Sequence, residues 1–89
     1  MLYIRYRMFY VYVLRSLKNH YRYIGQTNDL QRRIEEHNSG LTQSIRFQIP
    51  FALEYYEEYE TRVEAQKREK FLKTGKGREW LDKNIHSGV

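Results

Sequence analysis

The chain has 89 residues, a length that favours a single small domain, residues 1–89, with a modest hydrophobic core. It contains no cysteine, which excludes a disulfide framework and a thiolate metal site and agrees with a reducing, cytoplasmic location. Sixteen Lys and Arg against eleven Asp and Glu give a formal net charge of +5. This balance favours polyanionic partners, nucleic acid before an acidic membrane surface, although it also serves solubility alone.

The N-terminal segment from Met1 to Leu14 is fairly apolar, but Arg5 and Arg7 interrupt it. It has neither a continuous hydrophobic run nor a cleavage site of small residues, so we expect no signal peptide and no membrane span. Residue types alternate along it, and from about Phe9 both faces become apolar, as in a central β-strand.

A polar turn over residues 16–20 leads to a second strand over residues 21–25, which predicts a β-hairpin. We expect Gly25 to allow a tight exit from this strand that a Cβ atom would obstruct. A helix follows, because one helical face repeats through Leu30, Arg33, Ile34 and His37. A purely structural helix would more readily place leucine at Arg33 and His37, so both are candidate functional residues.

The ends of this helix carry capping signals. Asn28 with Gln31 matches a capping box, and Thr27 and Asp29 are further candidates for the N-cap. Gly40 is a suitable C-cap glycine.

The rest of the chain contains one more strand and two helices. Residues 41–51 form a loop with the only proline, and residues 52–59 form a third strand. A capping box at Thr61 and Glu64 begins a helix that extends to about Lys73. A short final helix spans residues 78–85, and residues 87–89 are a frayed end. This order predicts an α/β fold with a small antiparallel sheet flanked by helices, its core at about residues 9–85.

Within the later helix, Glu69 shares a face with Ala65 and Leu72. It is therefore an acid with apolar neighbours, a position that favours a metal ligand. The alternative is a solvated side chain paired with Arg68 or Lys73.

Three spaced groups of residues resemble the GIY-YIG nuclease family: Tyr10-Val11-Tyr12, then Tyr23-Ile24-Gly25, then Arg33, His37 and Glu69. The chain is most similar to the small, single-domain bacterial members, which are related to the amino-terminal domain of the excision-repair nuclease. The resemblance covers about residues 9–85 and implies a three-stranded antiparallel sheet with flanking helices. It also implies hydrolysis of DNA that depends on a divalent metal.

The resemblance assigns a catalytic site to five residues: Tyr12, Tyr23, Arg33, His37 and Glu69. Glu69 would be the metal ligand, holding one Mg²⁺ or Mn²⁺ ion. The sequence departs from the family pattern where Tyr10 replaces the first motif's glycine, and Asn84 is the candidate for a late family asparagine. The loop after Gly40, which is usually more basic in these proteins, here carries apolar residues.

Phosphodiester cleavage requires these kinds of side chain. One carboxylate is enough for Mg²⁺, which often keeps most of its water ligands, and the Arg33 guanidinium matches a phosphate. Tyr12 is the candidate general base, but its pKa would have to fall from about 10, so nearby cations are required. Tyr23 would orient water or phosphate. His37 would relay a proton or hold Tyr12 through a hydrogen bond.

The candidate nucleic-acid contacts are Gln26, Thr27, Arg32, Arg46 and Lys67. The basic turn at residues 73–78 (KTGKGR) lacks the spacing of a P-loop, so we interpret it as a helix end that can also contact DNA.

Two other classes of function remain open. One is a nucleic-acid-binding module without turnover, in which Tyr12 and Tyr23 are ordinary strand aromatics and His37 is a satisfied helix residue. The other is a protein-interaction domain or homodimer that uses the apolar 41–51 loop.

Overall fold

β1 (Phe9–Ser16) is the central strand of a three-stranded antiparallel sheet, with β2 (Arg22–Thr27) on one side and β3 (Phe51–Tyr59) on the other. The computed structural model describes residues 7–85. The helices are α1 (Leu30–Asn38), a 3-10 helix η1 (Gln43–Gln48), α2 (Arg62–Leu72) and α3 (Gly75–Asn84). The predicted three-stranded antiparallel sheet flanked by helices is confirmed.

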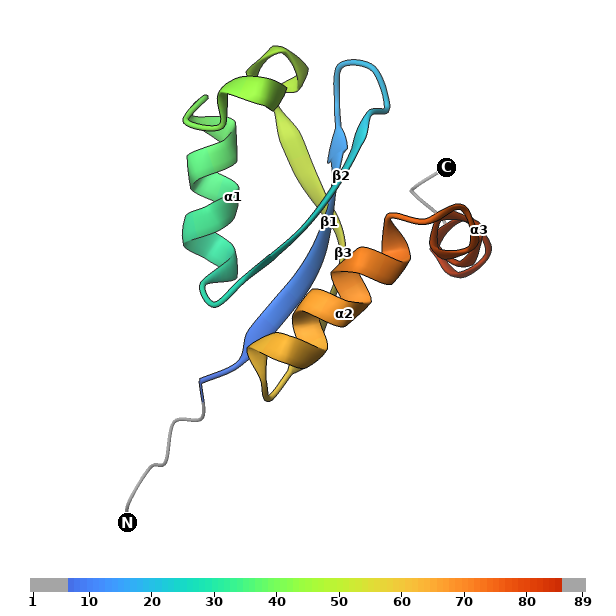
Figure 1. Cartoon of the computed structure of the whole chain (residues 1–89). Helices are drawn as coiled ribbons and strands as arrows, with labels where there is room; N and C mark the ends of the chain where they lie inside the picture. The colour runs from blue at the N-terminus through green and yellow to red at the C-terminus, as the bar shows by residue number, and fades with distance from the viewer. Residues whose placement is uncertain (1–6, 86–89) are drawn as a thin grey trace.

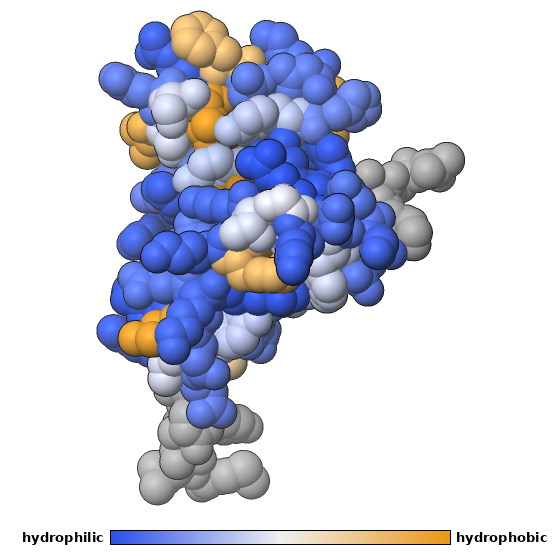
Figure 2. Space-filling view, turned by 45° about the vertical axis from the view of Figure 1, so that its right-hand side comes forward, coloured by the Kyte–Doolittle hydropathy of each residue, from blue (hydrophilic) through white to orange (hydrophobic). Residues whose placement is uncertain are grey.

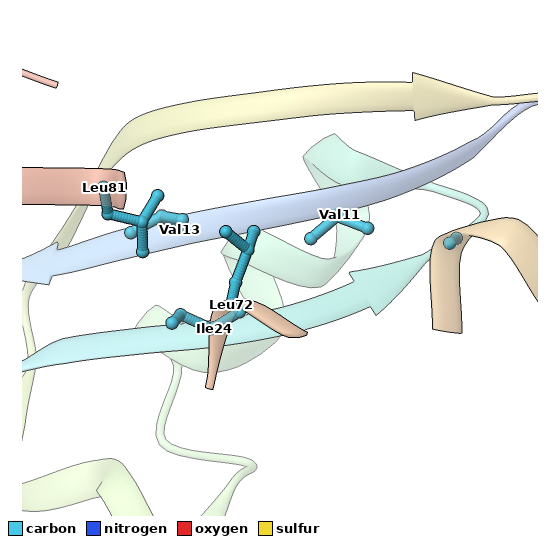
Figure 3. Packing of buried hydrophobic residues seen from close by; sticks show 6 residues of the cluster. Val11, Val13, Ile24, Leu72 and Leu81 are labelled. Carbon is cyan, nitrogen blue, oxygen red and sulfur yellow. The ribbon is translucent and has the colours of Figure 1, made fainter. Parts of the chain in front are cut away.

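β1 is buried on both faces, because α1 and η1 cover one side of the sheet and α2 and α3 cover the other (Figure 1). Val11 and Val13 point to the second side, where they pack with Ile24, Ala65, Leu72 and Leu81 (Figure 3). Tyr12 and Leu14 point to the first side, where they pack with Ile45 and Phe51. Two cores on one strand explain why its sequence is apolar at nearly every position.

Local hydrogen bonds determine where the helices begin and end. Thr61 Oγ1 accepts from the Glu64 N–H at 3.2 Å, which confirms Thr61 as the N-cap of α2. Gly40 has φ +84°, and the N–H groups of Gly40 and Leu41 donate to the carbonyls of His37 and Glu36. This is a Schellman motif, so Gly40 ends α1 as predicted.

Several predicted boundaries are wrong. Of the three N-cap candidates, Asp29 caps α1 in place of the capping box of Asn28 with Gln31, because its carboxylate accepts from the Arg32 N–H at 3.1 Å. β2 continues through Gly25 to Thr27, and η1 lies inside the expected loop. α3 begins at Gly75 rather than residue 78, since Thr74 Oγ1 caps it. The expected frayed end at residues 87–89 lies outside the described residues.

Figure 2, in which the side of the molecule with α2 and α3 comes forward, shows a mostly hydrophilic surface with hydrophobic residues in small groups. Within residues 7–85, no helix is both long enough and apolar enough to cross a membrane.

Candidate active site

Tyr12 and His37 meet between the sheet and α1, where both side chains are fully buried. The Tyr12 hydroxyl lies 2.8 Å from His37 Nε2, and Thr42 Oγ1 lies 2.9 Å from His37 Nδ1. Both ring nitrogens of the buried imidazole therefore have a hydrogen-bond partner. The predicted contact between His37 and Tyr12 is present. The contact with Thr42 was not predicted. The only signal for it in the sequence is that Thr42 follows His37 by five residues.

Tyr23 completes a cluster of three rings. Its ring centroid lies 4.7 Å from that of His37, edge to face, and 6.1 Å from that of Tyr12. The strands are paired so that Tyr12 lies opposite Gly25 and Leu14 lies opposite Tyr23. The structure therefore brings the two motif tyrosines and His37 together, although they lie on three different elements.

Gly25 makes room for Tyr12. A Cβ atom on Gly25 would lie 2.5 Å from the Tyr12 hydroxyl oxygen and 3.0 Å from the Tyr23 ring. Because Tyr12 is buried, its ring has no space to retreat. The expectation that Gly25 serves the exit from the strand is wrong, since β2 continues for two more residues, and the glycine is needed for a side chain across the sheet.

Asn38 holds the end of α1 in place. Its side-chain amide donates to the Phe51 carbonyl at 3.0 Å, and its side-chain oxygen accepts from the Phe51 N–H at 2.6 Å. These two bonds attach α1 to the first residue of β3. His37 precedes Asn38, so the same attachment positions the imidazole against Tyr12.

Burial changes the proton affinity of both groups. Desolvation, helped by the positive charge of Arg33, lowers the pKa of His37 to about 4, so this histidine is neutral at pH 7. Desolvation raises the pKa of Tyr12 well above its ordinary value, and the charges of Tyr23 and Glu69 act in the same direction. Arg33 opposes this rise by hydrogen bonding and by its charge. The pKa of Tyr12 is thus shifted away from the direction that a general base requires.

Arg33 lies beside the ring cluster and is partly exposed. Its guanidinium donates to Glu36 Oε1 at 3.1 Å, and its charge acts on both Tyr12 and His37. Its side chain is 36% exposed, so it is accessible to a ligand while it remains close to the buried rings.

Glu69 lies on α2, close enough for its charge to raise the pKa of Tyr12. Lys73 Nζ donates to Glu69 Oε2 at 2.8 Å, so one of the two alternative pairings of this acid is present. Glu69 borders an open hollow of about 640 Å³ along α2 that Lys67, Lys70 and Lys73 also line. The structure therefore provides both the carboxylate and free space beside it.

One carboxylate, that of Glu69, is available to a divalent cation, in a hollow that three lysines also line. Among the described residues, no three His, Cys, Asp or Glu side chains form a metal-binding cluster. Glu69 already has a cationic partner, the Lys73 ammonium, and its side chain is 22% exposed. A lone carboxylate beside open space suits Mg²⁺ or Mn²⁺, which bind through one or two carboxylates and keep several waters.

The other predicted contacts lie on several elements. Lys67 lines the hollow at Glu69, whereas Arg32 pairs with Glu36 on exposed α1 surface and Arg46 lies over Phe47 in η1. Thr27 Oγ1 bonds to Asp29 in the turn before α1, and the Gln26 side-chain oxygen is buried without a partner. The Asn84 amide donates to the Trp80 carbonyl in its own helix.

Comparisons with known proteins agree with this arrangement. A family model described as the GIY-YIG catalytic domain matches residues 8–82. A UPF0213 protein of Clostridium perfringens is 42% identical over 67 residues, which cover 74% of this chain and 71% of that protein. A UPF0213 protein of Halobacterium salinarum is 37% identical over 67 residues, covering 74% of this chain and 86% of that protein.

A solved structure has the same fold. The solution NMR structure of a UPF0213 protein from Bacillus halodurans is similar with a TM-score of 0.52 and 32% sequence identity, covering 85% of this chain and 83% of that chain. The chain belongs to the GIY-YIG family, as its motifs indicated, and its relatives are small UPF0213 proteins.

Proposed function

We propose that this protein is an endonuclease that hydrolyses DNA phosphodiester bonds with the help of one divalent metal ion, Mg²⁺ or Mn²⁺. One observation carries the proposal: Tyr12, Tyr23 and His37 form a ring cluster beside Arg33, and the charge of Glu69 acts on Tyr12. In a GIY-YIG domain, this arrangement supplies a phosphate-binding cation, a metal-binding acid and a path for a proton.

Two charged side chains have separate roles. The partly exposed Arg33 holds the phosphoryl oxygens of the scissile bond, because a guanidinium matches phosphate geometry and stays charged. Glu69 would hold the metal ion, which stabilises negative charge on the phosphoryl group and on the leaving oxygen.

Tyr12 and His37 act as a pair. When His37 carries its proton on Nδ1 and donates it to Thr42, Nε2 accepts from the Tyr12 hydroxyl. A proton from the attacking water passes to the Tyr12 oxygen while the phenolic proton passes to Nε2. His37 is neutral at pH 7 because burial lowers its pKa to about 4, so Nε2 carries no proton in this tautomer, and the same low pKa means that it holds a received proton only transiently. Arg33 opposes the rise in the pKa of Tyr12 that burial causes.

A cleavage panel of flaps, junctions, single strands and duplexes, with Mg²⁺, Mn²⁺ or EDTA, tests the proposal. We expect metal-dependent cleavage by the wild-type chain, and a loss of at least about 100-fold in each of the variants Glu69→Gln and Arg33→Ala. Glu64→Gln is the matched control, because it lies on the same helix and glutamine also completes a capping box with Thr61. Equal metal-dependent cleavage by all four preparations would refute the assignment.

An interaction module is the second candidate, since Leu41 and Phe47 are 71% and 69% exposed. The structure reduces the apolar surface on which this alternative depends. Ile45 and Phe51 are buried in the core under η1, and Ile49 packs against the same core. These apolar residues are therefore explained by the packing of η1, and only part of the 41–51 loop remains for a partner or a second copy.

A further inference from the structure

A groove follows β2, the edge strand of the sheet, on the side of the turn between α2 and α3. It consists of two adjoining hollows of about 350 and about 220 Å³ that share Tyr21, Arg22, Ile24 and Arg78. Tyr23 and Lys73 line the smaller hollow, and Lys73 also lines the hollow at Glu69. This β2 groove therefore leads directly to the candidate active site.

The β2 groove is positively charged where it approaches the site. Arg22, Lys73 and Arg78 line the smaller hollow, and none of the described residues that line it is acidic. Arg22 pairs with Asp82 at 3.0 Å, and Lys73 pairs with Glu69 at 2.8 Å. Arg78 is exposed and makes no ion pair within residues 7–85, so its guanidinium is available for an anion.

Close packing fixes the position of Arg78. A Cβ atom on the preceding residue, Gly77, would lie 2.0 Å from the Phe71 carbonyl oxygen and 2.5 Å from the Leu72 Cα. The first turn of α3 thus lies directly on the end of α2, and Thr74 Oγ1 caps it through the Gly77 N–H at 3.1 Å. The packed turn at residues 73–78 therefore fixes the backbone positions of two cations that line the groove, Lys73 and Arg78.

Tyr21 adds an aromatic surface to both hollows. It is 41% exposed, while its backbone is held in the hairpin: its carbonyl accepts from the Ser16 N–H at 2.7 Å, and its N–H donates to Asn19 Oδ1 at 3.2 Å. An exposed ring on a fixed backbone, next to cations, is suited to stacking on a base. A base has a free face for such stacking only when its strand is unpaired.

We propose that the β2 groove binds an unpaired arm of the DNA substrate, with Arg78 and Lys73 on its phosphates and Tyr21 stacked on a base. The identity of the ligand rests on the proposed nuclease function. The consequence for that function is a preference for flaps, junctions and other substrates with a single-stranded arm over blunt duplexes.

The test is the fluorescence anisotropy of a labelled oligothymidylate and of a labelled blunt duplex, titrated with the full chain in EDTA. We expect Tyr21→Ala to weaken single-strand binding by about tenfold, the effect of losing one stacked base, and Tyr21→Phe to restore it. We expect Arg78→Ala to weaken it several-fold and to reduce the slope of log K against log salt by about 0.7, as for one lost phosphate contact. Lys83→Ala is the control, because Lys83 is an exposed cation in the last turn of α3 that does not line the groove. We expect this variant to bind both oligonucleotides as the wild type does.

Several results would overturn the inference. The wild-type chain could fail to bind the single strand, or Tyr21→Ala could bind it with wild-type affinity. Arg78→Ala and Lys83→Ala could also lose the same amount of single-strand affinity. An equal loss of duplex and single-strand binding in Tyr21→Ala would also overturn it. Circular dichroism melts confirm that each variant is folded.

Because the measurement involves no cleavage, a chain that binds through the groove but never cuts DNA contradicts only the nuclease proposal. A nuclease that is insensitive to Tyr21 and Arg78 contradicts only the groove.

Discussion

Tyr12 shows how a single hydroxyl group can connect stability with chemistry. Its oxygen is the partner of His37 Nε2, both side chains are buried, and Gly25 leaves space for the hydroxyl. Removing the hydroxyl leaves the ring packing unchanged and leaves one nitrogen of a buried imidazole without a partner. The cost of an unsatisfied buried polar atom is about 1–3 kcal/mol.

We therefore predict that Tyr12→Phe lowers the free energy of unfolding by about 1–3 kcal/mol and reduces cleavage at least about 100-fold. Tyr10→Phe is the matched control, because Tyr10 lies on the same strand and its ring packs against Tyr56, 6.1 Å between centroids, outside the cluster. Urea unfolding and the cleavage panel measure the two effects. Equal losses in both variants would show that the Tyr12 hydroxyl has no special role.

The proposed proton path requires His37 to carry its proton on Nδ1 and to donate it to Thr42 Oγ1. With Thr42→Val the Nδ1 position loses its partner, so we predict reduced turnover and a change in its pH profile. Thr42→Ser keeps the hydroxyl and restores both. If Thr42→Val cleaves with the wild-type rate and pH profile, the tautomer of His37 does not depend on this contact.

For individual side chains, the sequence predicted the contact between Tyr12 and His37 but not the pKa values of the two groups. Spacing and family motifs predicted the contact between Tyr12 and His37. They did not predict that burial raises the pKa of Tyr12, because a period-two pattern does not measure how deeply a central strand is covered. They also did not identify Thr42, whose contact depends on the turn after Gly40.

The junction of α2 and α3 depends on backbone contact between the helices. Gly77 and Gly75 both lie in the first turn of α3, but only Gly77 has atoms in the space that a Cβ would occupy. Glycines two positions apart thus have different roles. The sequence alone predicts a helix end at residues 73–78, which include both glycines, and places the start of α3 too late, because a contact with α2 is not visible in local sequence.

We predict that Gly77→Ala lowers the free energy of unfolding by about 1–3 kcal/mol or more, since it forces atoms into a packed backbone contact. Gly75→Ala, with open space around it, should be neutral or stabilise the chain by up to about 1 kcal/mol. Urea titration with circular dichroism compares the two. Similar stabilities would mean that α3 does not pack on α2 as described.

Two helix boundaries were predicted correctly from local capping signals. Thr61 and Gly40 were identified correctly because their hydrogen bonds lie within four residues. The Asn38 bonds to Phe51 could not be predicted, because they join residues thirteen positions apart across an irregular segment. This attachment is nevertheless what orients α1 toward the sheet.

In the whole molecule, a partly buried ionic network joins the second helical layer to the sheet. Arg68 donates to both carboxylate oxygens of Glu57, at 2.9 and 3.0 Å, and Tyr55 and Tyr59 donate to the same carboxylate. The Arg68 guanidinium also lies 4.5 Å from the centroid of the Trp80 ring. The network joins β3, α2 and α3. Although burial acts to raise the pKa of Glu57, these hydrogen bonds outweigh it and the pKa is lowered.

Two titratable groups, the buried His37 and the partly buried Glu57, make the free energy of unfolding depend on pH in separate windows. The pKa of His37 is about 4 in the folded chain against an ordinary value of 6.5, so between these values the unfolded chain binds more protons. His37 therefore stabilises the fold above pH 6.5, and this contribution is lost as the pH falls toward 4. Glu57, with a lowered pKa, stabilises the fold above its ordinary value of 4.5 and loses this effect only at lower pH.

We predict that the free energy of unfolding falls between pH 6.5 and 4, with a slope of up to about 1.4 kcal/mol per pH unit from His37. His37→Gln should be less stable at pH 7 but should lack this slope, so the difference between the variant and wild type shrinks on acidification. His20→Asn, which removes an exposed imidazole at a position of positive φ that asparagine tolerates, should keep the wild-type slope. Urea unfolding at a series of pH values measures all three. A slope that survives in His37→Gln would mean that the imidazole is not held neutral between Tyr12 and Thr42, and the proposed proton path would lose its acceptor.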